Sequence, residues 1–566
     1  MDGRLFVTDT TPSARFPIYC RGNVGEVFPN VMTPMSSSLL RDPAARGQER
    51  MMVEFGMASP AHFVDSDSVL TGVFGGYMYG NVSLGRVGAA RIPGLKAADI
   101  DRELFGLSDA PPYVRQRGDR DARGSARAMR QMLRALFRAD SVAAPARAAG
   151  AEVAAWRATL PPIESSDQPT LVNVAAGVSP WFEWMMYHLL FTSAFSGLTR
   201  SIVERLVAKF DEPGLVNVLT AGLGTVESAR PANELWRLGR LVAVSPTLTA
   251  LFEDDSPGLH ARLRAERRAE QFNAGFDAFL AAHGARGPDE WELASPTWGD
   301  SPEIALAAID RLRLAPGARD PILATERLGD ERERRIADVR QRLRIGERSI
   351  FDRAVRATGL FAAEREATKA SFMRAVEPSK QALTELARRA AVAHDDLFLV
   401  TFDELPQLLA DPSSVAALID QRRARRAYLQ VRTPPFWFEH RQPPPETWPL
   451  RSDLARPDER ARVLTGMGVC PGIASGRARV VLDPADPRDL GADDVLIAPI
   501  TDPAWTPLFL AVAGVVVDVG AQQSHAAIVA RELGIPAVVS VTDASRTIPD
   551  GTLVTVNGTT GEVTVH

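Results

Sequence analysis

The sequence predicts a multidomain protein of α and α/β class, in which a large, mostly helical domain is followed by a small β/β/α domain. At 566 residues, the chain is longer than the roughly 250–300 residues at which one hydrophobic core stops growing. Apolar residues recur with helical spacing before residue 440, whereas strand-like alternation is concentrated after Arg477. We therefore expect a helical domain at 1–440, a linker at 441–463 and the small domain at 464–566.

Several segments of the first domain have the length and apolar spacing of helices, namely 124–139, 233–253, 257–282, 330–344 and 364–392. The predicted linker begins with three consecutive prolines in Gln442–Thr447, and a charged run then continues through Arg462. Proline stiffens such a segment and polar residues keep it solvated. A tether of this kind would let the domain that follows it move.

Composition argues against several classes of protein. The net charge of −5 provides no positive surface for nucleic acid or anionic membrane. The first residues lack the layout of a signal peptide, and the most apolar segment, 181–195, is interrupted by Glu183 and His188. We expect a cytoplasmic protein that binds neither nucleic acid nor membrane.

The two cysteines, Cys20 and Cys470, are far apart and have no metal-ligand spacing, which predicts buried thiols and no metal site. Lysines occur only at positions 96, 209, 369 and 380, and no glycine precedes any of them. A glycine-lysine phosphate loop is therefore absent from this sequence. We expect the chain itself to bind no cofactor.

One histidine lies at the start of a predicted helix, directly after a predicted strand. The valine-rich run 514–519 is typical of a buried strand, and Ser524 is a good N-cap for a helix over 526–533 that ends at Gly534. His525 then falls on the first turn, where the helix dipole favours an anion by ~0.3–1 kcal/mol. Because imidazole titrates near neutrality, a ring nitrogen of His525 is available to attack phosphorus. The alternative is a capped surface helix with an incidental histidine.

The segment QQSHAAIVARELGIPAV at 522–538 closely resembles the phosphohistidine signature of the PEP-utilising enzymes. The similarity extends to PGIASG at 471–476, to TDPAWTPLF at 501–509 and to 557–565. It implies that residues 464–566 form a swivelling phosphohistidine domain in which His525 carries the phosphoryl group. The sequence departs from the family at Ala521, where a second glycine is usual.

The upstream region resembles the acceptor-binding domain of rifampin phosphotransferase and its relatives. The matching motifs, in family order, are RGNVGEVFP at 21–29 with Thr33-Pro34, GARGPDE at 284–290 with SPTW at 295–298, REATK at 365–369, and DLFLVTFDEL at 396–405. The resemblance covers most of the chain, apart from the ATP-grasp domain that such enzymes carry first. Too few residues follow His525 for a PEP/pyruvate barrel. The resemblance implies that ATP and Mg bind to a separate ATP-grasp subunit. Direct use of PEP as the phosphoryl donor would also need another protein.

The expected catalytic residues are His525, Arg365, Glu366 and Lys369. On a helix, Arg365 and Lys369 at spacing i, i+4 share a face and provide a site for a phosphoryl group in transfer. Glu366 could orient Lys369 or act as general base towards an acceptor hydroxyl. The alternative is a solvated helix face with a Glu366–Lys369 ion pair.

Further residues are candidates for substrate binding. Arg286 and Glu290 lie in a glycine-bounded turn and would either contact phosphate or form a buried ion pair. The remaining candidates are Arg21, Asn23 and Glu26 for an acceptor pocket, Thr501, Asp502 and Thr506 for bonding the imidazole or capping a turn, and Ser524 beside the histidine. Tyr77, Tyr79, Trp181, Phe182 and Trp184 would line an apolar pocket or form plain core.

The expected function is that of a phosphotransferase component that moves a phosphoryl group from His525 to a hydroxyl of a small-molecule acceptor. The alternative is a non-catalytic relative that binds a ligand or a partner without turnover. Pocket shape decides which acceptor fits, and the sequence does not reveal that shape.

Overall fold

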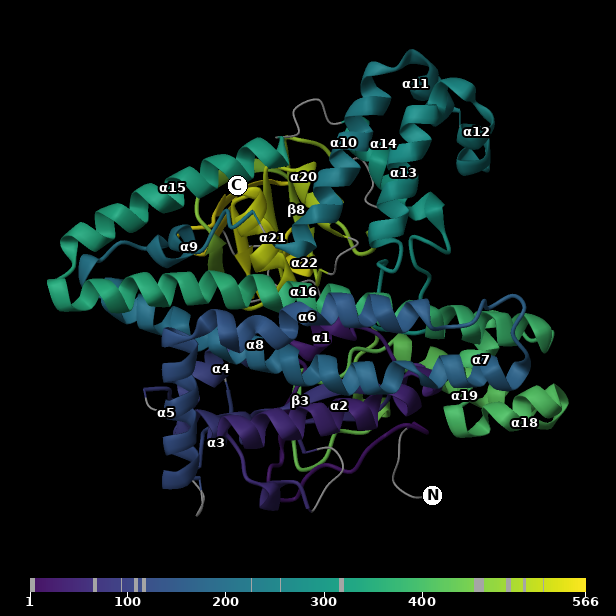
Figure 1. The fold of residues 1–566 in the computed structure, drawn as a ribbon, viewed down its shortest axis with the longest axis horizontal. Helices are drawn as coiled ribbons and strands as arrows, with labels where there is room; N and C mark the ends of the chain where they lie inside the picture. Colours follow the sequence, from purple (N-terminus) through teal and green to yellow (C-terminus); the bar gives the residue numbers. More distant parts are fainter. Residues whose placement is uncertain are drawn as a thin grey trace. The chain divides into compact units, whose positions relative to one another are not determined.

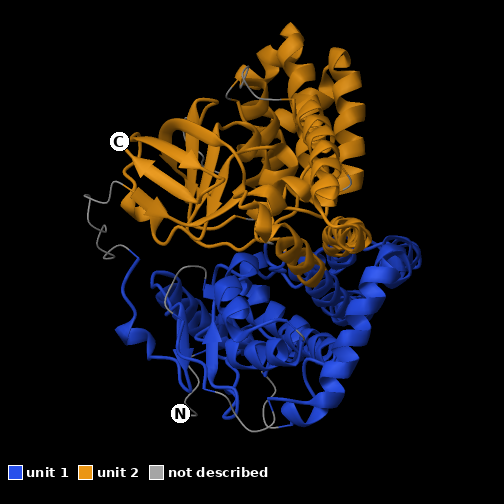
Figure 2. Cartoon of the chain, turned by 90° about the vertical axis from the view of Figure 1, so that its left-hand side faces the viewer, with its two compact units in different colours: residues 1–195, 291–295, 371–455 blue, residues 196–290, 296–370, 456–566 orange. Residues whose placement is uncertain are grey.

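The computed structural model describes residues 6–64, 69–92, 94–105, 110–114, 119–224, 226–254, 256–314, 320–451, 463–484, 490–501, 505–522 and 524–566. The chain forms two compact units (Figure 2). Unit 1 consists of residues 1–195, 291–295 and 371–455, and unit 2 of residues 196–290, 296–370 and 456–566. Each unit therefore takes residues from several parts of the 1–440 segment. The predicted domain boundaries remain a prediction.

Two long helices contribute residues to both units: α8 (Val178–Val207) and α16 (Ile345–Arg389). The other helices of unit 1 are α1 (Val24–Val27), α2 (Pro34–Phe55), α3 (Val82–Arg91), α4 (Ala97–Phe105), α5 (Ala122–Phe137), α6 (Ala139–Ala158), α7 (Gln168–Ala176), α17 (His394–Phe398), α18 (Leu405–Ala410) and α19 (Ala416–Gln430) (Figure 1). Its strands are β1 (Ile18–Cys20), β2 (Thr71–Phe74), β3 (Tyr77–Asn81) and β4 (Trp437–Glu439).

The four strands of unit 1 form an antiparallel sheet in the order β2-β3-β1-β4, which the sequence analysis did not predict. Each strand has only three to five residues, too few for a clear alternating pattern. In addition, β4 comes from the far end of the unit and pairs Phe438 with Tyr19. Tyr77 and Tyr79 are fully buried in the aromatic core beside this sheet. Of the two expectations for these residues, an apolar pocket or plain core, the structure shows core.

The start of the predicted linker is packed into unit 1. Gln442 is buried and donates from Nε2 to the Tyr79 hydroxyl at 2.9 Å. Trp448 is buried in the same aromatic core and donates from Nε1 to the carbonyl of Pro443. The charged part of the linker, 452–462, lies outside the described residues.

Most of the predicted helices are present, with different ends. The segment 233–253 forms two helices, α10 (Arg230–Val244) and α11 (Pro246–Glu253). Proline has no N–H to continue a helix, and the Ser245 side chain caps the new helix by accepting from the amide of Leu248. The segment 257–282 is likewise divided, into α12 (Leu259–Ala265) and α13 (Glu270–His283).

The remaining helices of unit 2 are α9 (Leu215–Leu219), α14 (Pro302–Leu314), α15 (Pro321–Arg342), α20 (Thr506–Leu510), α21 (His525–Leu533) and α22 (Ala544–Thr547). Its strands are β5 (Val463–Thr465), β6 (Met467–Cys470), β7 (Ile473–Val480), β8 (Asp494–Ala498), β9 (Gly514–Val517), β10 (Ala537–Val539), β11 (Leu553–Asn557) and β12 (Glu562–Val565). These elements confirm a small β/α domain at the C-terminal end of a chain that is otherwise mainly helical.

The eight strands of unit 2 form one mixed sheet, in the order β5-β12-β11-β7-β8-β9-β10-β6. Strands β7 to β10 are parallel, and the flanking pairs are antiparallel. In β9, Val515 and Val517 belong to one hydrophobic cluster and Val516 to another. Both faces of the central strands are therefore covered, which explains the continuous valine run in the sequence.

Helix α21 begins and ends where its sequence predicts. The Ser524 hydroxyl accepts from the amide of Ala527 at 3.3 Å, and Gly534 closes the helix in the left-handed conformation with φ 68°. All nine residues of the helix are buried. A helix buried on every side cannot be recognised from an amphipathic pattern, and this burial was not foreseen.

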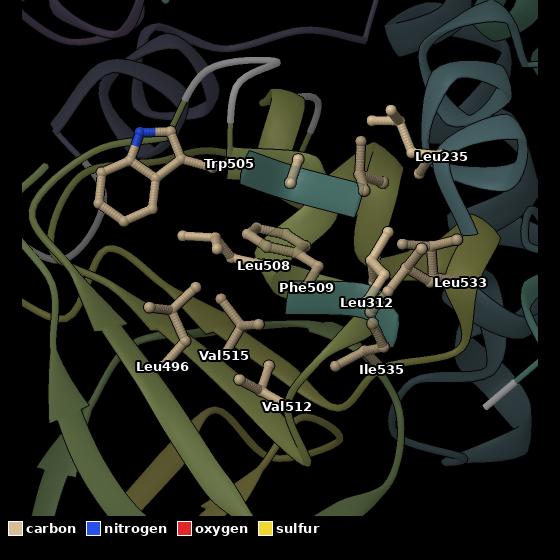
Figure 3. Packing of buried hydrophobic residues seen from close by; sticks show 14 of the residues in the cluster. Leu235, Leu312, Leu496, Trp505, Leu508, Phe509, Val512, Val515, Leu533 and Ile535 are labelled. Carbon is tan, nitrogen blue, oxygen red and sulfur yellow. The ribbon is translucent and has the colours of Figure 1, made fainter. Parts of the chain in front are cut away.

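One hydrophobic cluster joins the β/α domain to neighbouring helices of unit 2 (Figure 3). Leu508 and Phe509 of α20 and Ile535 after α21 lie in the same cluster as Leu235 of α10 and Leu312 of α14. The helices and the sheet domain therefore share a core.

Both cysteines are buried thiols, as the sequence predicts. None of the helices in the described part of the chain combines the length and the apolar character required to cross a lipid bilayer.

The shared core leads to a stability prediction. Leu312 is fully buried, so Leu312→Ala should lower the free energy of unfolding by about 2–5 kcal/mol through lost burial and a residual cavity. Amide exchange should accelerate in α20 and α21 as well as in α14. Leu314 of the same helix is 59% exposed, so Leu314→Ala should change stability by less than about 0.5 kcal/mol. Unchanged exchange in α20 and α21 would contradict a shared core.

Candidate functional site

His525 is the first residue of α21, and its ring lies against α20. The Thr506 hydroxyl and His525 Nε2 are 3.1 Å apart, a hydrogen bond whose direction depends on the imidazole tautomer. Nδ1 is buried and has no hydrogen-bond partner among the described residues. With Thr506 accepting from Nε2–H, the lone pair of Nδ1 is free. With Thr506 donating, Nε2 keeps its lone pair and Nδ1 carries the proton.

The ring of His525 is buried, but polar groups surround it. The residue is 7% exposed. Burial, together with the positive charges of Lys369, Arg286 and Arg365, holds the pKa of His525 well below its ordinary value. The imidazole is therefore neutral at physiological pH, with three cations nearby.

Glu290 joins two of these cations. Its carboxylate contacts Arg286 Nε at 2.6 Å and Lys369 Nζ at 3.1 Å. Burial raises the pKa of Glu290, but Arg286 and Lys369 outweigh this effect and hold the pKa below its ordinary value. The expected alternative of a buried Arg286–Glu290 ion pair is therefore present in the structure. This pair places the Arg286 and Lys369 side chains together.

The glycine-bounded turn that carries Arg286 follows α13 and lies close to the chain at 296–299. Backbone amides of Trp298 and Gly299 donate to the carbonyls of Arg286 and Gly284 at 2.7 and 2.8 Å. A Cβ atom on Gly287 would lie 2.5 Å from the carbonyl oxygen of Pro296. Glycine is therefore required for this close approach of the two backbone segments.

The third cation, Arg365, lies on α16 with Glu366 and Lys369. Arg365 Nη1 contacts Glu366 Oε1 at 2.5 Å. The expected alternative of a Glu366–Lys369 ion pair was wrong, because Lys369 pairs with Glu290 and Glu366 pairs with Arg365. Glu366 is 2% exposed, and its Oε2 atom has no hydrogen-bond partner among the described residues. A buried carboxylate oxygen without a donor can accept a proton.

The structure thus brings together His525, Thr506, Arg286, Glu290, Arg365, Glu366 and Lys369, all of which belong to unit 2. Ser524 is buried and caps the histidine helix. Thr501 is buried just after β8. Asp502 lies outside the described residues.

The pocket candidates at the start of the chain belong to unit 1. The guanidinium of Arg21 donates to the carbonyls of Phe28 and Pro29 at 3.1 and 3.0 Å and lies over the ring of Tyr77. Asn23, at the start of α1, has a positive φ of 59°, and Glu26 lies in that helix. Arg21 therefore holds a turn in place, and acceptor binding by these residues remains a prediction.

The aromatic residues of α8 form a row of ring contacts. Trp181 lies 6.4 Å from Trp184, and the Trp184 ring is 4.4 Å from that of His188, measured between centroids. Phe182 is buried against Trp291 and Phe372 and is a core residue. Trp181 and Trp184 are half-buried.

Sequence reasoning missed two residues of α21 that follow the histidine. Arg531 and Glu532 are both buried, and burial together with Arg200 lowers the pKa of Arg531 to about 9. The signal in the sequence is a charged pair within an otherwise apolar helix, which normally indicates an exposed face. No group of three or more histidine, cysteine, aspartate or glutamate side chains in the described part of the chain is placed to hold a metal ion.

Two segments of the chain match protein families. Residues 189–366 match the family described as rifampicin phosphotransferase fourth domain, and residues 490–561 match the mobile domain of PEP-utilising enzymes. The first segment contains Arg286, Glu290, Arg365 and Glu366, and the second contains His525. Each match thus covers part of the site, and Lys369 lies just beyond the first one.

Individual relatives cover different shares of the chain. An uncharacterized protein of Mycobacterium tuberculosis is 28% identical over 98% of this chain and 62% of its own length. Rifampicin phosphotransferase of a Streptomyces species is 33% identical over 64% of this chain and 42% of its own length. Prodigiosin synthesizing transferase PigC of Serratia marcescens is 30% identical over 62% of this chain and 40% of its own length.

The chain therefore spans less than two thirds of the length of each of these relatives. These matches confirm the resemblance of the chain to the PEP-utilising enzymes and, among them, to the rifampicin phosphotransferases.

Proposed function

We propose that this chain is a phosphotransferase component in which His525 carries a phosphoryl group and transfers it to a hydroxyl of a small-molecule acceptor. One observation carries the proposal: the imidazole of His525 is buried, and the charges of Lys369, Arg286 and Arg365 act on it. A neutral imidazole is a nucleophile, and three nearby cations suit the negative charge of a phosphoryl group.

The charges of the site favour an anion. The three cations face two carboxylates, Glu290 and Glu366, so the cluster has a net positive charge while the imidazole is neutral. A phosphoryl group carries about −1.5 to −2 charges at neutral pH. Because the site is buried, water screens these interactions weakly and each cation has a larger effect than it would at the surface.

Transfer to the acceptor then needs one bond exchange and one proton acceptor. The P–N bond to His525 breaks while a P–O bond forms to the acceptor oxygen, and the electron pair of the breaking bond returns to the imidazole. The hydroxyl proton passes to Oε2 of Glu366, which has no other donor among the described residues. Arg365 and Lys369 balance the charge on the phosphoryl oxygens during transfer.

Loading of His525 is assigned to a different arrangement and a different subunit. With 7% of the residue exposed, the ring is covered in the arrangement described here. The proposal therefore includes movement of the histidine-bearing domain and a separate ATP-grasp subunit that binds ATP and Mg. A non-catalytic role is disfavoured, because binding alone does not need the imidazole, the cations and a free carboxylate oxygen in one place.

The first prediction concerns the carrier residue. The chain with ATP and Mg alone should remain unmodified, and addition of an ATP-grasp partner should produce an acid-labile, alkali-stable phosphoryl mass addition. His525→Ala should abolish this addition. His566→Ala changes an exposed histidine of the same domain and should leave it intact. Phosphorylation by ATP without a partner would refute the separate subunit, and no phosphorylation of His525 with any partner would favour the non-catalytic alternative.

Lys369 should act on discharge of the phosphohistidine. Lys369→Met removes a cation next to His525 and should slow transfer to the acceptor by about 100- to 1,000-fold, the usual effect of removing one charge-stabilising group. Loading of His525 by the partner should change little, since it is assigned to another arrangement. Single-turnover decay of the phosphohistidine with and without acceptor measures the effect. Lys209→Met, at a partly exposed lysine paired with Glu347, is the control and should change neither rate.

The lowered pKa of His525 predicts that its imidazole does not gain a proton between pH 8 and pH 6. A histidine with an ordinary pKa near 6.5 is about three-quarters protonated at pH 6, whereas His525 should stay neutral between pH 8 and pH 6. Because this pKa is lower in the folded chain than in the unfolded one, its contribution to stability is present above about pH 6.5 and is lost as the pH falls. NMR of ¹³C-labelled histidine, assigned with His525→Gln, measures the titration. Lys369→Met should raise the pKa, and an ordinary pKa in the unaltered chain would contradict the cationic setting.

A further inference from the structure

The end of α21 opposite His525 is held by a carboxylate clamp. Glu532 accepts from the backbone amide of Leu223 through Oε1 and from that of Gly224 through Oε2, both at 3.1 Å. The two amides belong to the loop after α9, so Glu532 joins the histidine helix to the helical part of unit 2. A carboxylate that accepts two amide donors is a directional, charge-assisted contact.

The carbonyl side of the same loop is also held. Arg332 of α15 donates from Nη1 to the carbonyl of Ala221 at 3.1 Å and to that of Gly222 at 2.6 Å. The Thr325 hydroxyl, also on α15, lies within donating distance of two carbonyls, that of Pro321 at 2.8 Å and that of Glu532 at 3.0 Å. Helix α15 therefore contacts both the loop after α9 and helix α21.

The loop conformation depends on glycine. Gly222 and Gly224 have φ values of +57° and +69°, in the left-handed region. A Cβ atom on Gly222 would lie 2.5 Å from the Cβ of Leu328. These two positions allow consecutive amides, at 223 and 224, to point at one carboxylate.

The carboxylate of Glu532 is buried, which is unfavourable for its charged form. Glu532 is 2% exposed and forms no ion pair among the described residues. Burial raises its pKa, while the two amides and the charges of Arg531 and Arg332 lower it, and the net direction is upward. Burial of the charge thus offsets part of what the two hydrogen bonds contribute, which leaves a contact that is specific but can open.

We propose that the Glu532 clamp is the latch that keeps His525 covered, and that its opening is required before the histidine can be phosphorylated. Helix α21 is short and buried along its whole length, so it moves as one body. His525 at its first residue and Glu532 near its last are two anchors of that body. An unphosphorylated imidazole is neutral and has little attraction for the cationic cluster, so the clamp holds it there. This inference depends on the proposed function only for the meaning of phosphorylation.

The test measures how fast His525 becomes accessible, and it needs no partner protein. The full chain is treated with potassium phosphoramidate, a small phosphoryl donor that reacts with imidazole, and the peptide containing His525 is followed by mass spectrometry. Glu532→Gln keeps the size of the side chain and places an amide donor against a backbone amide. It should increase the rate at His525 by about 10-fold, as expected for loss of a charge-assisted hydrogen bond. Glu562→Gln, at an exposed glutamate of the same domain, should leave the rate within about twofold, since it affects no buried contact.

Amide exchange in the unaltered chain provides a second measurement that does not depend on a variant. If opening of the clamp uncovers His525, one opening equilibrium constant should describe two measurements. These are the exchange of the Leu223 and Gly224 amides and the reaction of the His525 ring with phosphoramidate. The proposal is overturned if the His525 ring becomes exposed while the amides of Leu223 and Gly224 stay protected from exchange. It is also overturned if Glu532→Gln speeds exchange of these amides and leaves the reaction rate at His525 unchanged. Glu532→Asp, which keeps the charge on a shorter side chain, replaces the glutamine variant if that variant does not fold, and the same comparison applies.

Diethyl pyrocarbonate separates failure of the latch from failure of the proposed function. This reagent modifies any accessible imidazole, whether or not the residue is a phosphoryl carrier. Faster modification of His525 in Glu532→Gln, without phosphorylation by phosphoramidate or by a partner, would support the latch and refute the carrier role. No acceleration with either reagent would refute the latch alone.

Discussion

The site depends on one buried carboxylate. Arg286 comes from the turn after α13 and Lys369 from α16, and Glu290 holds both within hydrogen-bond distance. Without this bridge, the buried guanidinium of Arg286 and the half-buried ammonium of Lys369 would repel each other, and each would gain by moving towards water. With it, Arg286 and Lys369 lie close enough to His525 to add to the effect of burial, which is the main cause of the lowered pKa of the imidazole. The charges around His525 therefore depend in part on a contact between two segments that are far apart in the sequence.

Local rules account well for the histidine helix. Ser524 and Gly534 fix its ends, and the first turn places His525 where the sequence predicts. These features depend on residues within one or two turns, so they can be predicted from the sequence alone. The burial of the whole helix depends on what packs against it, and that comes from α15, α20 and the sheet. For the same reason, the contacts of Glu532 could not be predicted from the sequence, because its partners are backbone amides more than three hundred positions away.

The partners of the charged residues show the same limit. The sequence placed Arg365, Glu366 and Lys369 on one helix and, through family resemblance, near His525, and the structure has them there. It could not assign the ion pairs, because spacing along one helix favours Glu366–Lys369, whereas the observed partner of Lys369 is Glu290 from another segment. The small sheet of unit 1 was missed for a related reason. Its strands are short, and β4 pairs with β1 across almost the whole length of that unit.

Two kinds of contact hold the β/α domain against the rest of unit 2, and they contribute differently. Leu508 and Phe509 share a core with Leu312, and such apolar side chains each contribute about 1.5–3 kcal/mol when fully buried. This burial is non-directional, so it favours docking without selecting one orientation of α21. Hydrogen bonds are directional, and the two that Glu532 accepts are satisfied in only one position of the helix. Apolar burial thus supplies most of the docking free energy, and the polar contacts decide that docking presents His525 to Lys369 and Arg286 instead of a position a few ångströms away.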